Sequence, residues 1–433
     1  MKIGAKNKKL NSNVFYSLLS KSVGLCLSFI TIPIALKYLG QESYGLWITI
    51  FGIVNWINFF DFGLGHGLRN KLSEALAIRD KDKIKLIIQT GYSSVIFIAF
   101  LAFLLSIPFI YNINWNGLMN TSVITNSTFV SLIFFTALYV FLSFVLNLIK
   151  PIFYAYEQPQ FVGYLNVIQQ LLFLLGILYL SNKYLSNLIF FSHAYGISMF
   201  ISAFILSFIF FSNKKEFIPR KFTLKSIKST GILNLGLSFF VIQISILVLQ
   251  SSDNIIITSF LGPGEVVPYS IVLKLFSVST MLYGAVFLNS LRSSITHANK
   301  IKDFKYLKII KKKIVIGFFV GICLNIILYI FFDPILAIWL DDRNVFIPHG
   351  LKNLMLIYSI MLIWNGSFIV YLNALSEIRG QLIISVFQAI INIPLSIILI
   401  EYTNFGSKGV IFATIICLIP MSIYAPIKCL RIK

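Results

Sequence analysis

The chain has 433 residues, of which 58% are hydrophobic and only 12% are charged, and its formal net charge at pH 7 is +21. In a soluble protein this excess of Lys and Arg would favour nucleic acid as a partner. A composition this apolar excludes a soluble protein. We therefore expect the chain to lie in a lipid bilayer and to bind no nucleic acid. The four cysteines form no Cys-x-x-Cys pair, and no Walker motif is present. The sequence therefore predicts neither a metal site nor direct use of ATP.

Long apolar runs follow one another along the chain and define the predicted elements. A helix needs about 20 apolar residues to cross a hydrocarbon core of roughly 30 Å, whereas a barrel strand would be about 10 residues long and polar on one face. Twelve runs are long enough for a helix, in chain order at residues 13–36, 44–68, 86–110, 127–155, 159–181, 187–212, 231–261, 266–291, 312–333, 350–374, 380–401 and 407–428. The expected fold class is therefore all-α integral membrane, with twelve transmembrane helices.

Lys and Arg are concentrated in alternate loops between these runs. With the N-terminus placed in the cytoplasm, the cytoplasmic segments carry 29 of the 36 basic residues. The opposite segments carry five: Lys37, Lys183, Arg343, Lys352 and Lys408. Because basic loops near the ends of spans resist translocation, this distribution predicts that both termini are cytoplasmic. The two remaining basic residues, Lys21 and Lys274, fall inside predicted spans.

A weak internal repeat relates the two halves of the chain. Short motifs that close the first and second spans recur about 222 residues later, at the ends of the seventh and eighth spans. These motifs are Leu39-Gly40 and Leu68-Arg69 in the first half, and Leu261-Gly262 and Leu291-Arg292 in the second. Six spans in each half would give both halves the same direction across the membrane, which is the arrangement of parallel repeats.

The repeat predicts three parts of the chain. We expect an N-terminal six-helix lobe at residues 1–212, a cytoplasmic linker at 213–230 and a C-terminal six-helix lobe at 231–433. Two such lobes are typical of transporters, which open a central cavity alternately to each side of the membrane.

Four ionisable side chains are expected inside spans: Lys21, Asp61, Asp253 and Lys274. At 1.5 Å per residue, the first two lie about 11 to 12 Å from the cytoplasmic ends of their spans, and the last two about 12 Å from the outer ends of theirs. Charges of opposite sign at matched depth favour two buried ion pairs. They equally favour cations that line a path for an anionic substrate, with the aspartates as competing groups whose protonation couples transport to protons.

Two arginines and three amides are further candidates for substrate contacts. Arg69 and Arg292 are expected at the cytoplasmic ends of equivalent spans, where a forked guanidinium suits bidentate capture of phosphate. Both also fit the general excess of positive charge on the cytoplasmic side. Candidate hydrogen-bond partners for sugars are Asn55, Asn58 and Gln243, with polar contacts between helices as the alternative.

Several motifs along the chain resemble those of a known family. They are Ile30 to Pro33, Tyr38-Leu39-Gly40 with Tyr44-Gly45-Leu46-Trp47, Phe60 to Asn70, and Ser252-Asp253 leading to Leu261-Gly262. Together they resemble the Wzx-type O-antigen flippases of the multidrug/oligosaccharidyl-lipid/polysaccharide (MOP) exporter superfamily.

The resemblance implies a fold, a substrate and partners. It implies two six-helix bundles around a central cavity that opens alternately to cytoplasm and periplasm, in the bacterial inner membrane. It also implies an undecaprenyl-pyrophosphate-linked oligosaccharide as the substrate, a polysaccharide polymerase and chain-length machinery as partners, and no cofactor beyond a coupling H⁺ or Na⁺. The cationic cavity of that family corresponds by position to Lys21, Arg69, Lys274 and Arg292, whereas Asp61 and Asp253 depart from a wholly cationic cavity.

Two alternatives stay open from the sequence. A cation-coupled exporter of drugs or small molecules, from the same superfamily, would use the buried acids to bind cationic substrates. A membrane-embedded polymerase or glycosyltransferase is a third class, but the outer loops at about 111–126 and 334–349 are too short for a separate catalytic domain.

Overall fold

The computed structural model of the chain describes residues 2–59, 64–223, 237–288, 291, 294–295, 298, 303–340, 345–375 and 377–431. These residues are helical apart from short connections. The chain divides into two compact units, Met1–Phe240 (unit 1) and Val241–Lys433 (unit 2).

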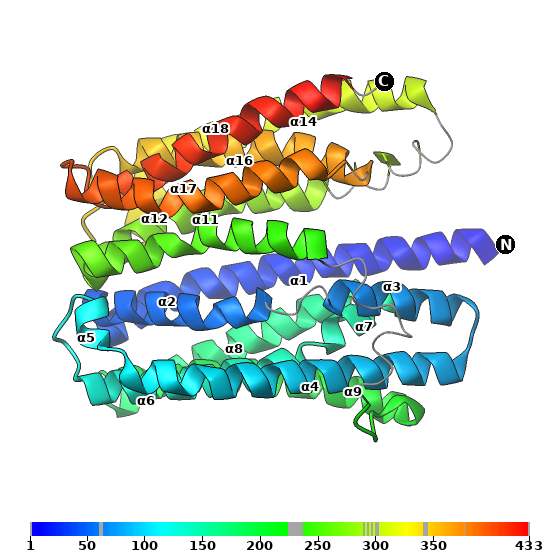
Figure 1. Cartoon of the computed structure of the whole chain (residues 1–433), viewed down its shortest axis with the longest axis horizontal. Helices are drawn as coiled ribbons and strands as arrows, with labels where there is room; N and C mark the ends of the chain where they lie inside the picture. Colours follow the sequence, from blue (N-terminus) through cyan, green and yellow to red (C-terminus); the bar gives the residue numbers. More distant parts are fainter. Residues whose placement is uncertain are drawn as a thin grey trace. The chain divides into compact units, whose positions relative to one another are not determined.

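Unit 1 is built from long helices that lie alongside one another (Figure 1). Its described elements are α1 (Lys2–Leu39), α2 (Gln41–Asn55), the 3₁₀ turn η1 (Trp56–Phe59), α3 (Leu64–Ala77), α4 (Lys81–Asn112), α5 (Trp115–Leu118), α6 (Asn126–Leu146), α7 (Ile149–Ala155), α8 (Pro159–Lys183), α9 (Leu188–Asn213) and η2 (Lys215–Phe217). Helix α8 packs against α1 and α9, and α6 packs against α4 and α9.

Unit 2 begins within α11 and repeats this helical construction. Its described elements are α11 (Leu237–Leu261), η3 (Pro263–Glu265), α12 (Val266–Tyr283), the π-helical turn η4 (Gly284–Leu288), α14 (Phe304–Ile330), α15 (Phe332–Leu340), α16 (Leu351–Ala374), α17 (Arg379–Glu401) and α18 (Ser407–Arg431). The buried Asn325 of α14 joins three helices, because its side-chain oxygen accepts hydrogen bonds from Ser279 of α12 at 2.8 Å and Ser359 of α16 at 2.6 Å. Such polar contacts between helices stabilise packing where no water competes.

The helices identify a multi-pass membrane protein. Among the described residues, 11 helices are long and apolar enough to cross a bilayer. Helix α4 shows the surface expected for lipid contact, with Phe97, Phe100, Leu105 and Phe109 all exposed. A water-soluble helix would bury such side chains, so these faces match a hydrocarbon solvent.

The second predicted span differs most from the structure. Residues 44–68 were expected to form one helix, but α2 ends at Asn55, η1 follows, and α3 begins at Leu64. Residues 60–63 lie outside the described part of the chain. Polar and aromatic residues from Asn55 to Asn58 interrupt the apolar run and are weaker helix formers than Leu or Ala, which agrees with the change to a 3₁₀ turn.

Several helices extend beyond their predicted ends into the basic segments. Helix α1 begins at Lys2 and α14 at Phe304, whereas the apolar runs begin at residues 13 and 312. The apolar run marks only the part of a helix that contacts hydrocarbon. Lys, Glu, Arg and Leu are good helix formers in water, so the backbone continues past that limit.

The two halves share an unusual backbone conformation at their repeated glycines. Gly40, between α1 and α2, has φ 77° and ψ 167°, and Gly262, after α11, has φ 92° and ψ 160°. This region of backbone space is essentially restricted to glycine. The repeat therefore extends from sequence to local geometry, because the same turn connects the first two helices of each half.

Candidate functional site

A cavity of about 450 Å³ lies within unit 1. Its walls come from α2, α3, α4, α8, α9 and the junction between α6 and α7, and its lining residues are Phe51, Asn55, Gly65, Val95, Phe144, Asn147, Leu148, Lys150, Pro151, Gln169, Tyr195 and Met199. The cavity thus combines one cation, three amides and several aromatic or aliphatic side chains. Polar and apolar side chains share its wall, and a concave site with convergent polar groups is a candidate binding site.

The local sequence explains how Lys150 reaches the cavity. Pro151 has no N–H, so it cannot donate to the carbonyl oxygen of Asn147, which would be its partner in a continuous helix. The N–H of Lys150 donates to that oxygen instead, at 3.0 Å, and the single helix predicted at 127–155 is divided into α6 and α7. Pro151 is tolerated in the first turn of α7, and this break places Lys150 on the cavity wall.

The Lys150 side chain is half-buried, and within the described part of the chain its ammonium group makes no hydrogen bond or ion pair. A cation in a membrane-spanning unit is costly and usually faces a water-filled cavity or an anion. The cavity therefore has a cationic group that the surrounding described residues do not neutralise.

Aromatic packing positions the opposite wall of the cavity. The ring of Tyr195 contacts the rings of Phe51 and Phe173, with centroids 4.6 and 4.7 Å apart. Gln169 donates a hydrogen bond from its amide to the Tyr195 hydroxyl at 3.3 Å. Edge-on contacts of this kind hold aromatic side chains in fixed orientations, so the polar atoms of Gln169 and Tyr195 are presented to the cavity in a defined way.

Arg69 lies one helical turn beyond the cavity-lining Gly65 on α3. Its side chain is exposed, and its guanidinium carbon lies 5.1 Å from the ring centroid of Tyr154 on α7. Residues four apart share one face of a helix, so Arg69 follows Gly65 along α3 and Tyr154 follows Lys150 along α7. A second cation is thereby placed beside the part of the wall that carries Lys150.

In unit 2, the carboxylate of Asp253 on α11 is buried, with 4% of the residue exposed. The hydroxyl of Tyr269 on α12 donates a hydrogen bond to its Oδ2 atom, while Oδ1 has no hydrogen-bond partner among the described residues. Lys274, the predicted partner of Asp253, is half-buried on α12, and their ion pair stays a prediction. Tyr269 was not among the predicted site residues, although it lies early in the span that follows Asp253.

The remaining predicted site residues have mixed outcomes. Asn55 lines the cavity, Lys21 is exposed on α1, and Gln243 is half-buried on α11. Asp61, Arg292 and the side chain of Asn58 lie outside the described residues, so the predicted pair of Lys21 with Asp61 is untested.

Of the cavity's polar residues only Asn55 was predicted, and Lys150 is the one charged residue among the described residues that line it. It was counted with the cytoplasmic basic residues because it lies near the end of a predicted span. The pattern that could have identified it is a single lysine directly before a proline, within the apolar stretch Leu148 to Phe153. Proline breaks a helix and exposes backbone, which in a membrane protein is tolerated mainly beside a cavity.

Solved structures show which class of protein has this fold. An inward-facing multidrug resistance MATE family transporter of the MOP superfamily matches with a TM-score of 0.76 at 13% identity, over 95% of this chain and 98% of that chain. An outward-facing structure of such a transporter matches with a TM-score of 0.67 at 12% identity, over 97% and 95% of the two chains. The predicted all-helical membrane fold of the MOP superfamily is confirmed.

The sequence itself shows the family. Residues 10–291 match the family described as "Polysaccharide biosynthesis protein", and the chain belongs to that family. The "Putative O-antigen export protein" of Yersinia pseudotuberculosis is 26% identical over 409 residues, which cover 90% of this chain and 89% of that protein. The "Putative O-antigen transporter" of Salmonella typhimurium is 24% identical over 387 residues, which cover 87% and 86%.

Proposed function

We propose that the protein translocates an oligosaccharide linked to undecaprenyl pyrophosphate across the bacterial inner membrane. The observation that carries this proposal is the unit 1 cavity, which places the cation Lys150 among amide and aromatic side chains. Membership of the polysaccharide biosynthesis family and the names of the two relatives agree with a carbohydrate cargo.

The chemistry of the cavity suits the two polar parts of such a cargo. Sugars and pyrophosphate cannot cross hydrocarbon unless polar groups replace their water. Lys150 would attract the pyrophosphate, while amides such as Asn55 and Gln169 offer both donors and acceptors to sugar hydroxyls. The isoprenoid tail can stay in the surrounding lipid, because it is as apolar as the bilayer core.

The architecture that we propose for this function has twelve spans in two parallel six-helix lobes. The N-terminal lobe would comprise residues 1–212, the linker 213–230 and the C-terminal lobe 231–433. The lobes would enclose a central cavity that opens alternately to the two sides of the membrane. The matching conformations of Gly40 and Gly262 support the repeat, and we assign α2 with α3 as the interrupted second span.

We further propose cytoplasmic termini and coupling to H⁺ or Na⁺. The excess of basic residues in alternate loops supports this orientation. Asp253 could exchange a proton or cation, because it is a buried carboxylate whose Oδ1 atom has no hydrogen-bond partner among the described residues. A polysaccharide polymerase and its chain-length machinery would use the translocated product.

Deletion of the protein from its host tests the cargo. We expect undecaprenyl-linked units to accumulate on the cytoplasmic face of the membrane and surface polysaccharide to be lost. A plasmid copy of the unaltered chain should restore the polysaccharide. Accumulation of unpolymerised units on the periplasmic face would instead identify a polymerase, and an unchanged surface polysaccharide would exclude the proposed cargo.

The second candidate is a cation-coupled exporter of small molecules, favoured by the buried Asp253 and by the fold that the chain shares with MATE transporters. An exporter of this kind would change the sensitivity of the host to cationic drugs. In the deletion strain, altered drug sensitivity with intact surface polysaccharide would support this candidate in place of the flippase.

A further inference from the structure

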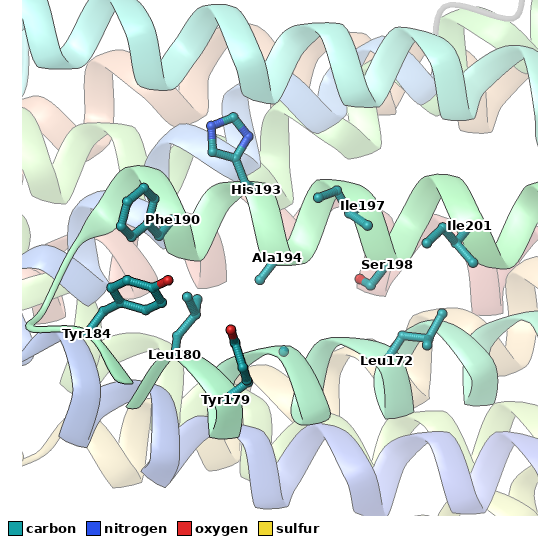
Figure 2. Close-up of a pocket in the computed structure, with 11 residues that line it drawn as sticks. Leu172, Tyr179, Leu180, Tyr184, Phe190, His193, Ala194, Ile197, Ser198 and Ile201 are labelled. Carbon is teal, nitrogen blue, oxygen red and sulfur yellow. The ribbon is translucent and has the colours of Figure 1, made fainter. Parts of the chain in front are cut away.

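A second, apolar hollow lies in unit 1, separate from the cavity that contains Lys150. It is a groove of about 410 Å³ between α8 and α9, lined by residues from Leu172 to Tyr184 and from Phe190 to Ile201 (Figure 2). Small residues keep it hollow, since a Cβ atom placed on Gly176 would lie 3.3 Å from the Cβ atom of Ala194. Both helices are candidate membrane spans, and the groove residues Tyr179, Phe190 and Ile197 are exposed apolar side chains, which suits a groove that opens to hydrocarbon.

The groove changes in character from one end to the other. Tyr179, Tyr184 and Phe190 gather at one end, whereas Leu172 and Ile201 form the other (Figure 2). The ammonium group of Lys183 lies 5.1 Å from the ring centroid of Tyr179, so a cation adjoins the aromatic end. Lysine and tyrosine are typical of the membrane interface, and aliphatic side chains are typical of the bilayer core. The aromatic end of the groove therefore suits the interface, and the aliphatic end suits the core.

The histidine in the groove wall is already engaged elsewhere. Figure 2 shows His193 pointing away from α8. Its ring nitrogen Nδ1 is hydrogen-bonded to the Tyr139 hydroxyl of α6 at 3.1 Å. The polar tips available to a ligand at the aromatic end are therefore those of Lys183 and the two tyrosines.

The length of the groove fits one leaflet of a bilayer. Phe190 and Ile201 are separated by about 16 Å along α9, at 1.5 Å per residue. Half of a hydrocarbon core of roughly 30 Å is about 15 Å, which is the depth reached by one acyl chain. A much longer isoprenoid chain would extend past the aliphatic end.

We propose that this groove binds one acyl chain of an anionic phospholipid, whose phosphate is held by Lys183. The charge argues for an anionic headgroup, because Lys183 is one of only five basic residues on the side predicted to be periplasmic. A lysine near the membrane surface attracts anionic headgroups, and the tyrosine hydroxyls can donate hydrogen bonds to phosphate oxygens. The site is independent of the proposed function, since it shares no residue with the Lys150 cavity.

Native mass spectrometry of the purified full chain tests this site. The protein would be mixed with equal amounts of palmitoyl-oleoyl phosphatidylglycerol and phosphatidylethanolamine. We expect phosphatidylglycerol to be retained preferentially, and Lys183→Gln to lower its retention about fivefold, the effect of one surface lysine. The matched control is Lys408→Gln, which removes a basic residue from unit 2 on the same predicted side and should change nothing.

A second variant tests the groove itself. Ile197 is 44% exposed on the groove wall, so Ile197→Trp should fill the space without disturbing the core, and should lower retention of both phospholipids. Thermal unfolding in detergent would confirm that each variant is folded. Equal retention of the two phospholipids by the unaltered protein would overturn the proposal, as would an equal loss with Lys408→Gln. Preferential retention of undecaprenyl phosphate, from a parallel mixture that contains it with phosphatidylglycerol, would also overturn the proposal. Lys150→Gln should retain phosphatidylglycerol normally, which separates this site from the transport function.

Discussion

At the scale of single residues, substitution of the half-buried Lys150 can show whether this cation binds substrate or stabilises the fold. A structural ion pair would lose stability when one partner is removed, because the other charge would stay buried alone. Lys150 has no ionic partner among the described residues, so its removal strands no described anion. Its charge raises the free energy of the protein without substrate, and an anionic substrate would offset that cost by pairing with it.

We therefore predict that Lys150→Gln lowers transport at least tenfold without lowering thermal stability. Loss of one charge-assisted contact to phosphate removes about 1.5 to 3 kcal/mol, which corresponds to a factor of about 10 to 150. The measurement is surface polysaccharide in a deletion strain that carries the variant, together with unfolding of the purified protein in detergent. The matched control is Lys85→Gln, at an exposed lysine of α4. Normal polysaccharide with Lys150→Gln would exclude this cation from the substrate path.

Sequence reasoning identified only part of this site. Asn55 was predicted because an amide inside an apolar span is conspicuous. Lys150 was not, because a count of charges by loop assigns every lysine near the end of a span to the loop. Pro151 signals a helix break beside this lysine. Whether the lysine then points into a cavity depends on the packing of α2, α8 and α9, which no sequence pattern specifies.

The hydroxyl of Tyr269 should stabilise unit 2 through Asp253. Tyr269→Phe leaves both oxygens of a buried carboxylate without a described partner and should cost about 1 to 3 kcal/mol of unfolding free energy. The matched control is Tyr44→Phe, at a buried tyrosine of the first half whose hydroxyl has no hydrogen bond within the described residues and should matter little. In an Asp253→Leu background, Tyr269→Phe should lose most of its effect, as a double-mutant cycle requires. An unchanged effect in that background would show that Tyr269 acts through packing alone.

At the scale of elements, the turn after the first helix of each half depends on glycine. Gly40 and Gly262 adopt nearly the same backbone angles, and no atom lies within 4 Å of a Cβ placed on Gly40. Any penalty for a side chain at Gly40 must therefore come from the backbone rather than from a collision.

Gly40→Ala should destabilise unit 1 by about 1 to 3 kcal/mol, the cost of holding alanine in this region of backbone space. Gly52→Ala is a sharp control, because a Cβ there also meets nothing within 4 Å but the residue lies inside α2, in its last turn. In a helix, alanine is favoured over glycine by about 0.5 to 1 kcal/mol, so this variant should be neutral or more stable. Thermal unfolding in detergent measures both. Equal effects of the two substitutions would contradict the backbone argument.

The positions of the long helices could be predicted from the sequence, because contact with hydrocarbon requires long apolar runs. Apolar runs located the long helices, since each must cover a bilayer of known thickness. They did not locate the breaks, which arise from hydrogen bonding and local propensity. The division of the predicted 127–155 helix follows from one missing N–H at Pro151, and the end of α2 at Asn55 follows from a short polar and aromatic stretch.

At the scale of the whole molecule, the distribution of basic residues predicts the orientation of the chain in the membrane. The predicted repeat must be consistent with that orientation. Lys and Arg near the ends of spans remain on the cytoplasmic side, and 29 of the 36 fit one orientation. An even number of spans in each half then places the ends of both halves on that same side. The predicted orientation and the predicted parallel repeat therefore depend on each other. One span too few in the first half would contradict both.

Reporter fusions test this orientation at three points. Alkaline phosphatase is active only in the periplasm, so we expect activity when it is fused after Tyr184, in the connection between α8 and α9, and none when it is fused after Arg79, in the turn between α3 and α4. Green fluorescent protein folds in the cytoplasm and should fluoresce at the C-terminus. Arg79 follows the interrupted pair α2 and α3, so an inactive fusion there requires that these two short helices together cross the membrane once. Phosphatase activity after Arg79 would mean that α2 and α3 enter and leave on one side, which would reduce the first half to five spans and make the two halves opposite in direction.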